Sequence, residues 1–93
     1  MLSWSERARK LMDDFLAERI TVQQFCSAYE TMWNFDDDRA ALSAADLAVF
    51  EKLLDATVWY TPVAEDRRIT PRYKDEAEVL NAVHAARLAL NGG

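Results

Sequence analysis

Four segments of this chain begin with the residue pattern that caps an α-helix. In each segment a Ser, Thr or Asp is followed three positions later by an acidic or amide residue, and such pairs satisfy free backbone N–H groups in the first turn of a helix. The pairs are Ser3 with Glu6, Thr21 with Gln24, Ser43 with Asp46, and Asp75 with Glu78. Four such starts are hard to obtain by chance, so the pattern predicts an all-helical (all-α) chain.

Apolar residues recur at intervals of three and four behind each start, as on the buried face of an amphipathic helix. In the third segment they are Leu47, Phe50, Leu53, Leu54, Thr57 and Val58. Four helices joined by short and medium links predict a four-helix antiparallel bundle that forms a single domain over residues 1–93. The connection at 61–75 contains Pro62 and Pro71, so we expect a long loop between helices three and four.

The negative charge is concentrated in one part of the sequence. The chain has a net charge of −5, and residues 30–55 carry seven acids against two bases, whereas acids and bases balance in the remainder. Such a sector repels nucleic acid and anionic membranes and steers association towards basic partners. The alternative is that the charge serves solubility alone.

The sequence also bears on location. No apolar run approaches the roughly 20 residues needed to span a bilayer, and residues 1–10 carry charges where a signal peptide needs its apolar segment. Cys26 is the single cysteine and cannot form an internal disulfide, which is consistent with a reducing compartment. We therefore expect a cytoplasmic protein without a membrane partner.

Residues suited to catalysis are scarce. His84 is the only histidine, Cys26 lies on the apolar face of the second helix, and both glycines are terminal, which excludes a glycine-rich phosphate loop. Neither an enzyme nor a cofactor is expected. Asp36, Asp37 and Asp38 lack the alternating ligands and turn glycine of a calcium loop, so a partner-facing patch is favoured over a metal-binding domain.

The end of the third helix offers an aromatic pair. Trp59 and Tyr60 are adjacent, and adjacent helical positions diverge by about 100°, so at least one should lie at the surface near Asp55. Trp and Tyr are enriched among interface residues that dominate binding energy. In the alternative interpretation, the long connection folds back and covers both rings.

The long connection carries charges of both signs. Glu65 and Asp66 precede the four bases of this segment, which are Arg67, Arg68, Arg72 and Lys74. These bases are able to pair with nearby acids, which would reduce the acidic patch offered to a partner.

Three stretches resemble the colicin D type immunity proteins, a bacterial family that includes immunity proteins of contact-dependent growth inhibition. They are LMDDFLAERITVQQFCSAYETMW (11–33), LSAADLAVFEKLLDATVWYTP (42–62) and EDRRITPRYKDEAEVLNAV (65–83), and together they cover most of the sequence. The resemblance implies a four-helix bundle that binds a cognate toxin nuclease domain, often one acting on tRNA. It also implies that acidic side chains block the toxin's active site.

Relatives place acids around the proline-containing loop after the third helix, and those positions map here to Asp55, Glu65 and Asp66. This chain departs from the family by having Val63 directly after Pro62, where an acid is common. It also departs by its basic run, Arg67, Arg68 and Arg72, and these departures indicate a partner surface shifted towards Asp36, Asp37 and Asp38.

The resulting hypothesis is a non-enzymatic immunity protein that binds a basic toxin domain as a monomer in a 1:1 heterodimer. Its predicted toxin-binding residues are Asp36, Asp37, Asp38, Asp55, Trp59, Tyr60, Glu65 and Asp66. The alternative is a small acidic helical adaptor or regulatory protein that binds a basic partner unrelated to toxins.

Overall fold

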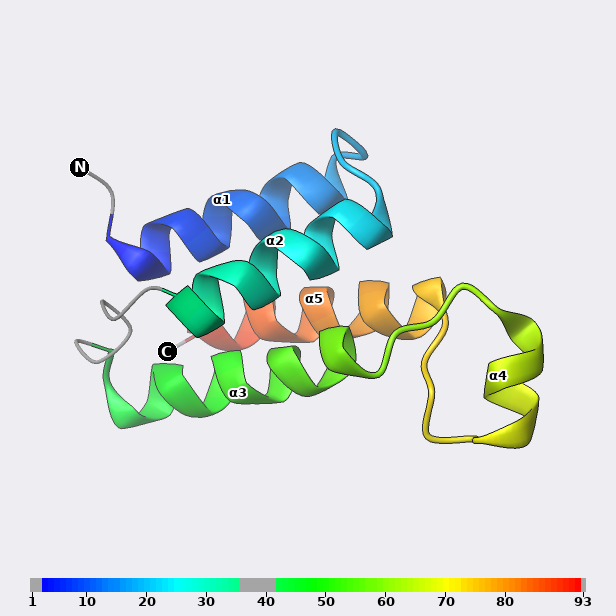
Figure 1. Cartoon of the computed structure of the whole chain (residues 1–93). Helices are drawn as coiled ribbons and strands as arrows, with labels where there is room; N and C mark the ends of the chain where they lie inside the picture. Colours follow the sequence, from blue (N-terminus) through cyan, green and yellow to red (C-terminus); the bar gives the residue numbers. More distant parts are fainter. Residues whose placement is uncertain (1–2, 36–41, 93) are drawn as a thin grey trace.

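The computed structural model describes residues 3–35 and 42–92, and within them the chain forms five α-helices and no strand. The helices are α1 (Trp4–Leu16), α2 (Val22–Phe35), α3 (Ala44–Val58), α4 (Ala64–Ile69) and α5 (Glu76–Gly92) (Figure 1). The all-helical prediction is confirmed. The prediction of a plain loop after the third helix is wrong, because that connection contains the short helix α4.

The helix caps form where the sequence places them. The pairs Ser3 with Glu6, Thr21 with Gln24, and Asp75 with Glu78 each make two reciprocal hydrogen bonds between side chain and backbone. Ser43 accepts from the backbone N–H of Asp46 at 3.1 Å. As a result α1, α2, α3 and α5 each begin directly after the predicted cap.

The four longer helices pack against one another, and α4 does not join them. α3 packs along α5, α1 packs along α2, α2 also contacts α3, and both α1 and α2 contact α5. α4 projects from one end of the molecule (Figure 1). The undescribed residues 36–41 are flanked by Phe35, the last residue of α2, and by Leu42, which lies two residues before α3. None of the described helices is both long and apolar enough to cross a membrane.

An aromatic cluster joins α1, α2 and α3. The Trp4 ring is buried and makes edge-to-face contacts with Tyr29, Trp33 and Phe50, at centroid distances of 6.1, 6.0 and 4.9 Å. The Tyr29 hydroxyl donates to the Phe50 carbonyl at 2.7 Å, and the indole N–H of Trp4 donates to the Met32 carbonyl at 3.3 Å. These two bonds satisfy the polar atoms that the aromatic rings bring into the core.

One residue of the predicted core is buried as expected and another is exposed. Cys26 is buried as expected, and burial raises the pKa of its thiol to about 12, so it is neutral at physiological pH. Val58 was expected on the buried face of the third helix but is 52% exposed, whereas Ala56 and Thr57 are buried. α3 ends at Val58, so the last turn presents that side chain to solvent.

Candidate protein-binding surface

The connection between α3 and α5 is a closed loop, which we call the arm (residues 61–74). At its base the N–H of Thr61 donates to the Lys74 carbonyl at 3.0 Å, and the N–H of Lys74 donates to the Trp59 carbonyl at 2.7 Å. These bonds make a parallel bridge between Tyr60 and Lys74. A compact loop whose ends meet in this way is an Ω-loop, and such loops are frequently functional.

None of the α4 residues is buried, so apolar packing contributes little to holding the arm. Polar contacts near the base of the arm hold it instead. The guanidinium of Arg67 donates to the Thr61 carbonyl at 2.6 Å, and the carboxylate of Asp66 accepts from the Thr61 hydroxyl at 3.4 Å. Val63 and Ile69 leave 48% and 68% of their surface exposed. The arm therefore offers apolar side chains to solvent from a short, separately held element.

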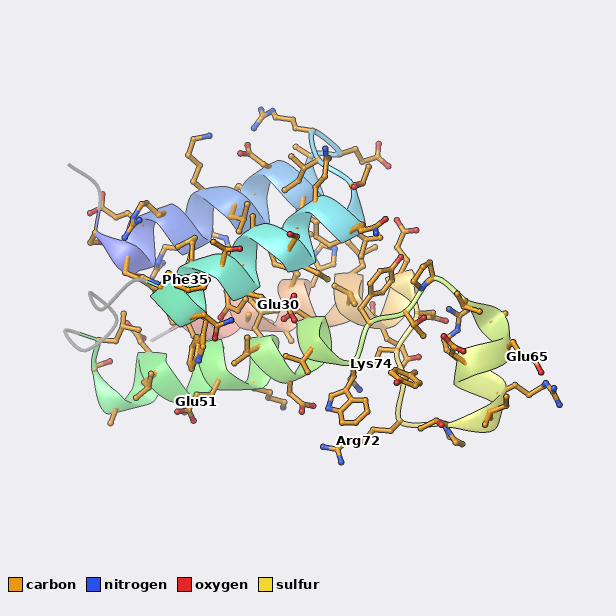
Figure 2. All side chains as sticks on the ribbon, in the orientation of Figure 1. Glu30, Phe35, Glu51, Glu65, Arg72 and Lys74 are labelled. Carbon is orange, nitrogen blue, oxygen red and sulfur yellow. The ribbon has the colours of Figure 1, made fainter. Side chains whose placement is uncertain are left out.

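The arm folds back over Trp59. The guanidinium of Arg72 lies 4.1 Å from the centre of the Trp59 ring, and the Tyr73 ring lies 5.5 Å from it. A nitrogen of Arg72 is also 4.0 Å from the Asp55 carboxylate. Figure 2 shows Arg72 beside the bridge residue Lys74 at the base of the arm. In the alternative interpretation the connection covers both aromatic rings. For Trp59 the connection does fold back over the ring, through Arg72 and Tyr73.

Trp59 and Tyr60 are both half-buried. The sequence argument assumed that both residues continue the third helix, but α3 ends at Val58 and Trp59 is its C-cap. Tyr60 is already in the bridge to Lys74. The angular divergence of helical neighbours thus does not apply to this pair.

Bases of the arm pair with nearby acids, as the sequence allowed. Glu65 contacts the guanidinium of Arg68 within α4, and Lys74 lies 4.0 Å from Glu78. With the pair between Arg72 and Asp55, two of the predicted toxin-contacting acids already have a cationic neighbour. The patch that the arm offers to a basic partner is correspondingly smaller.

The predicted site residues fall in two places. Asp55, Trp59 and Tyr60 at the end of α3 lie beside the arm that carries Glu65 and Asp66. Asp36, Asp37 and Asp38 lie outside the described residues. Leu42, which follows them, precedes α3, and the 15 residues of that helix separate it from the arm by about 22 Å at 1.5 Å per residue.

A groove of about 350 Å³ runs along α2 opposite the start of the arm. Cys26, Glu30 and Phe35 of α2 line one side, and Tyr60 and Pro62 line the other. The Glu30 side chain is half-buried, and burial raises the pKa of its carboxyl group. Phe35 is 83% exposed at the end of the helix (Figure 2). We call this the Glu30 groove.

Tyr60 and Pro62 also line a second groove, of about 560 Å³, together with Arg67, Asp75 and Glu76. Burial raises the pKa of Tyr60, and the nearby Glu76 carboxylate adds to the effect. Tyr60 is therefore a neutral aromatic side chain at the junction of two open grooves.

Sequence reasoning counted Glu30 in the acidic sector but did not select it as a site residue. The signal was present, because Glu30 follows the buried Cys26 by four positions and so lies on the same side of α2. The opposite wall, made by Tyr60 and Pro62, depends on how the arm folds back. That part could not be read from local spacing.

Within the described residues no group of three or more His, Cys, Asp or Glu side chains is arranged to hold a metal ion. The candidate ligands Asp36, Asp37 and Asp38 lie outside those residues. Comparison of the chain with protein-family models, with curated proteins and with solved structures finds no match.

Proposed function

We propose that this protein is an immunity protein that binds a cognate bacterial toxin domain, a basic tRNase-like nuclease, and keeps substrate from its active site. The proposal joins the sequence resemblance to one structural observation, the distribution of unpaired acids over the surface. The protein acts without catalysis and without a cofactor.

The unpaired acids of α2 and α3 carry the proposal. Two of the three acids on α1 have cationic neighbours, since Asp13 pairs with Arg87, and Asp14 pairs with Lys10 and Arg19. In contrast, Glu30, Asp46 and Glu51 form no ion pair with any Lys or Arg among the described residues. Figure 2 labels two of them, Glu30 on α2 and Glu51 on α3.

Unpaired surface acids suit a nuclease inhibitor for a physical reason. A nuclease cleft is positively charged because it holds a polyanion, so an acidic inhibitor is steered towards it and excludes the substrate. Acids already paired with arginine contribute less, since their field is largely cancelled at short range. Glu51 and Asp46 should therefore contribute more to association than Asp55 and Glu65.

Tyr60 is the favoured aromatic anchor of this surface. Both rings are half-buried, but Trp59 contacts Arg72 and Tyr73, whereas Tyr60 borders both grooves. A ring that is held in place and still reachable loses little entropy on binding.

The proposed scaffold is an antiparallel four-helix bundle of α1, α2, α3 and α5, from which the arm and its short helix α4 project. In this proposal the protein works in the cytoplasm of the toxin-producing cell. It binds the toxin domain as a monomer, in a 1:1 heterodimer.

A growth assay tests the proposal. Where a secreted protein is encoded beside this gene, its C-terminal domain is expressed in a susceptible host, with and without this protein. Co-expression should restore growth. Unrelieved killing, in cells where both proteins are made and folded, would reject the immunity function and favour an adaptor with another basic partner.

Matched double variants locate the contact. Asp46→Asn with Glu51→Gln removes two unpaired charges, and Asp55→Asn with Glu65→Gln removes two paired ones. The first variant should slow association with the toxin domain about threefold to tenfold more than the second. The reverse order would assign the main contact to the arm. Unchanged helical circular dichroism controls for folding.

A further inference from the structure

The Glu30 groove contains a carboxylate without a matching cation. Glu30 is the only charged residue in the groove lining and the only charged residue of α2. No described Lys or Arg forms an ion pair with it, and its side chain is half-buried. A partly desolvated carboxylate without a partner is unfavourable, so a cation entering the groove recovers part of that cost.

Both walls of the groove are held in place by contacts elsewhere. On α2 the Tyr29 hydroxyl is bonded to the Phe50 carbonyl, which fixes this helix against α3. On the other wall Tyr60 packs against the core and is bridged to Lys74. A groove with fixed walls does not have to be ordered when a partner binds, which favours affinity.

The size and chemistry of the groove suit one long side chain. Its volume of about 350 Å³ is at the small end of the range of roughly 300–1,000 Å³ that is typical of ligand pockets. The lining combines the Glu30 carboxylate with the aromatic rings of Tyr60 and Phe35. A guanidinium group binds carboxylates with two parallel hydrogen bonds and stacks on aromatic faces, whereas an ammonium group is a strongly hydrated point charge.

We propose that the Glu30 groove receives an arginine side chain of the protein partner, with its guanidinium on the Glu30 carboxylate and its aliphatic stem against Tyr60 and Pro62. This inference rests on the proposed function, because it names the side chain that the basic partner presents. It adds a specificity site on α2 that is separate from the acids of the α3 junction.

A nuclear magnetic resonance titration tests the groove without any toxin. Backbone amide shifts of the full chain are followed while N-acetyl-arginine methylamide is added, and the lysine and norleucine analogues are the comparison ligands. The arginine compound should shift amides around Cys26, Glu30 and Tyr60 more than lysine does, and norleucine should leave them unchanged. The shifts should vanish in Glu30→Gln.

Glu51→Gln is the matched control, because it removes the same charge from a neighbouring helix without touching the groove lining. It should keep the arginine-dependent shifts. The inference is overturned if the shifts are scattered over the surface, if norleucine reproduces them, or if they persist in Glu30→Gln.

The toxin domain then separates the two proposals. If it binds, Glu30→Gln should weaken the affinity by about tenfold or more and Glu18→Gln, which removes an exposed acid outside the proposed contact, by much less, because a desolvated pair depends more on its partner than an exposed charge does. Equal losses of affinity in the two variants would reject the arginine site in the Glu30 groove but not the immunity function. Absence of toxin binding by the unmodified protein would reject the immunity function, while the titration still decides whether the groove selects arginine.

Discussion

The guanidinium of Arg72 lies over the Trp59 ring, 4.1 Å from its centre. The same side chain reaches within 4.0 Å of the Asp55 carboxylate, so Arg72 ties the returning half of the arm to the end of α3. One residue thereby covers an aromatic ring and partly neutralises an acid, both of which the sequence had offered to a partner.

Replacing Arg72 with Ala should lower the free energy of unfolding by about 0.5–1 kcal/mol, the usual range for an exposed cation–π contact. It should also shift tryptophan emission to longer wavelength, since Trp59 gains contact with water. Urea unfolding and fluorescence check both effects. Arg68→Ala is the control, because its pair with exposed Glu65 is worth less. Indistinguishable behaviour of the two variants would mean that Arg72 does not hold the arm.

Tyr29→Phe removes the buried hydrogen bond to the Phe50 carbonyl and leaves the ring in place. The expected cost is about 1 kcal/mol, the typical net contribution of such a bond. Tyr60→Phe is the matched control, since the described structure contains no hydrogen bond from its hydroxyl group. In thermal unfolding followed by circular dichroism, Tyr60→Phe should have a higher midpoint temperature than Tyr29→Phe. The opposite order would contradict the described packing.

Glu18, which follows the C-cap residue Ala17 of α1, adopts a left-handed conformation with φ of 62°. Its N–H donates to the Phe15 carbonyl and the N–H of Arg19 donates to the Asp14 carbonyl, which together form a Schellman motif. Glycine adopts this conformation without steric cost, so Glu18→Gly should stabilise the fold by roughly 0.5–1 kcal/mol. Ala17→Gly, at the preceding residue with ordinary φ, should destabilise it. Urea unfolding of both variants tests this, and a loss of stability in Glu18→Gly would refute the turn geometry.

Glu30 should make stability depend on pH in a defined direction. Burial raises its pKa above the ordinary value of 4.5, so its contribution is most favourable below that value and is lost as pH rises through the folded pKa. Glu30→Gln should therefore be the more stable protein at pH 7, by less than about 1 kcal/mol because water still reaches the carboxylate. The difference should disappear below pH 4.5.

The neighbouring groups do not obscure that test. Burial raises the pKa of Cys26 to about 12 and also raises that of Tyr60, so neither titrates in the same interval. Urea midpoints measured across the acid range provide the comparison. If the difference in stability between the unmodified protein and Glu30→Gln stays constant with pH, burial does not raise the pKa of Glu30.

The long helices could be predicted because their determinants are local. Each N-terminus is specified by a cap pair such as Ser3 and Glu6, and each buried face follows a spacing of three and four. α4 lacks both signals, since its N-cap is Val63, which makes no side-chain cap, and six residues are too few to show periodicity. A weaker signal was present, because Glu65 and Asp66 precede Arg67 and Arg68, the charge order that suits a helix dipole.

The candidate site was only partly predictable for the same reason. The arm and the end of α3 were identified from the prolines and the aromatic pair. That Arg72 would cover Trp59, and that Tyr60 would face Glu30 across a groove, depends on the path of the arm after Pro62. Contacts between residues far apart in sequence cannot be predicted from the spacing of apolar and capping residues along a segment.

The most direct measurement of the central claim is tRNA cleavage by the proposed partner, a purified cognate toxin domain, in the presence of increasing amounts of this protein. Cleavage should fall to background at one molar equivalent, and bovine serum albumin at the same concentration should have no effect. Undiminished cleavage in the presence of several equivalents of folded protein would contradict the proposed nuclease inhibition.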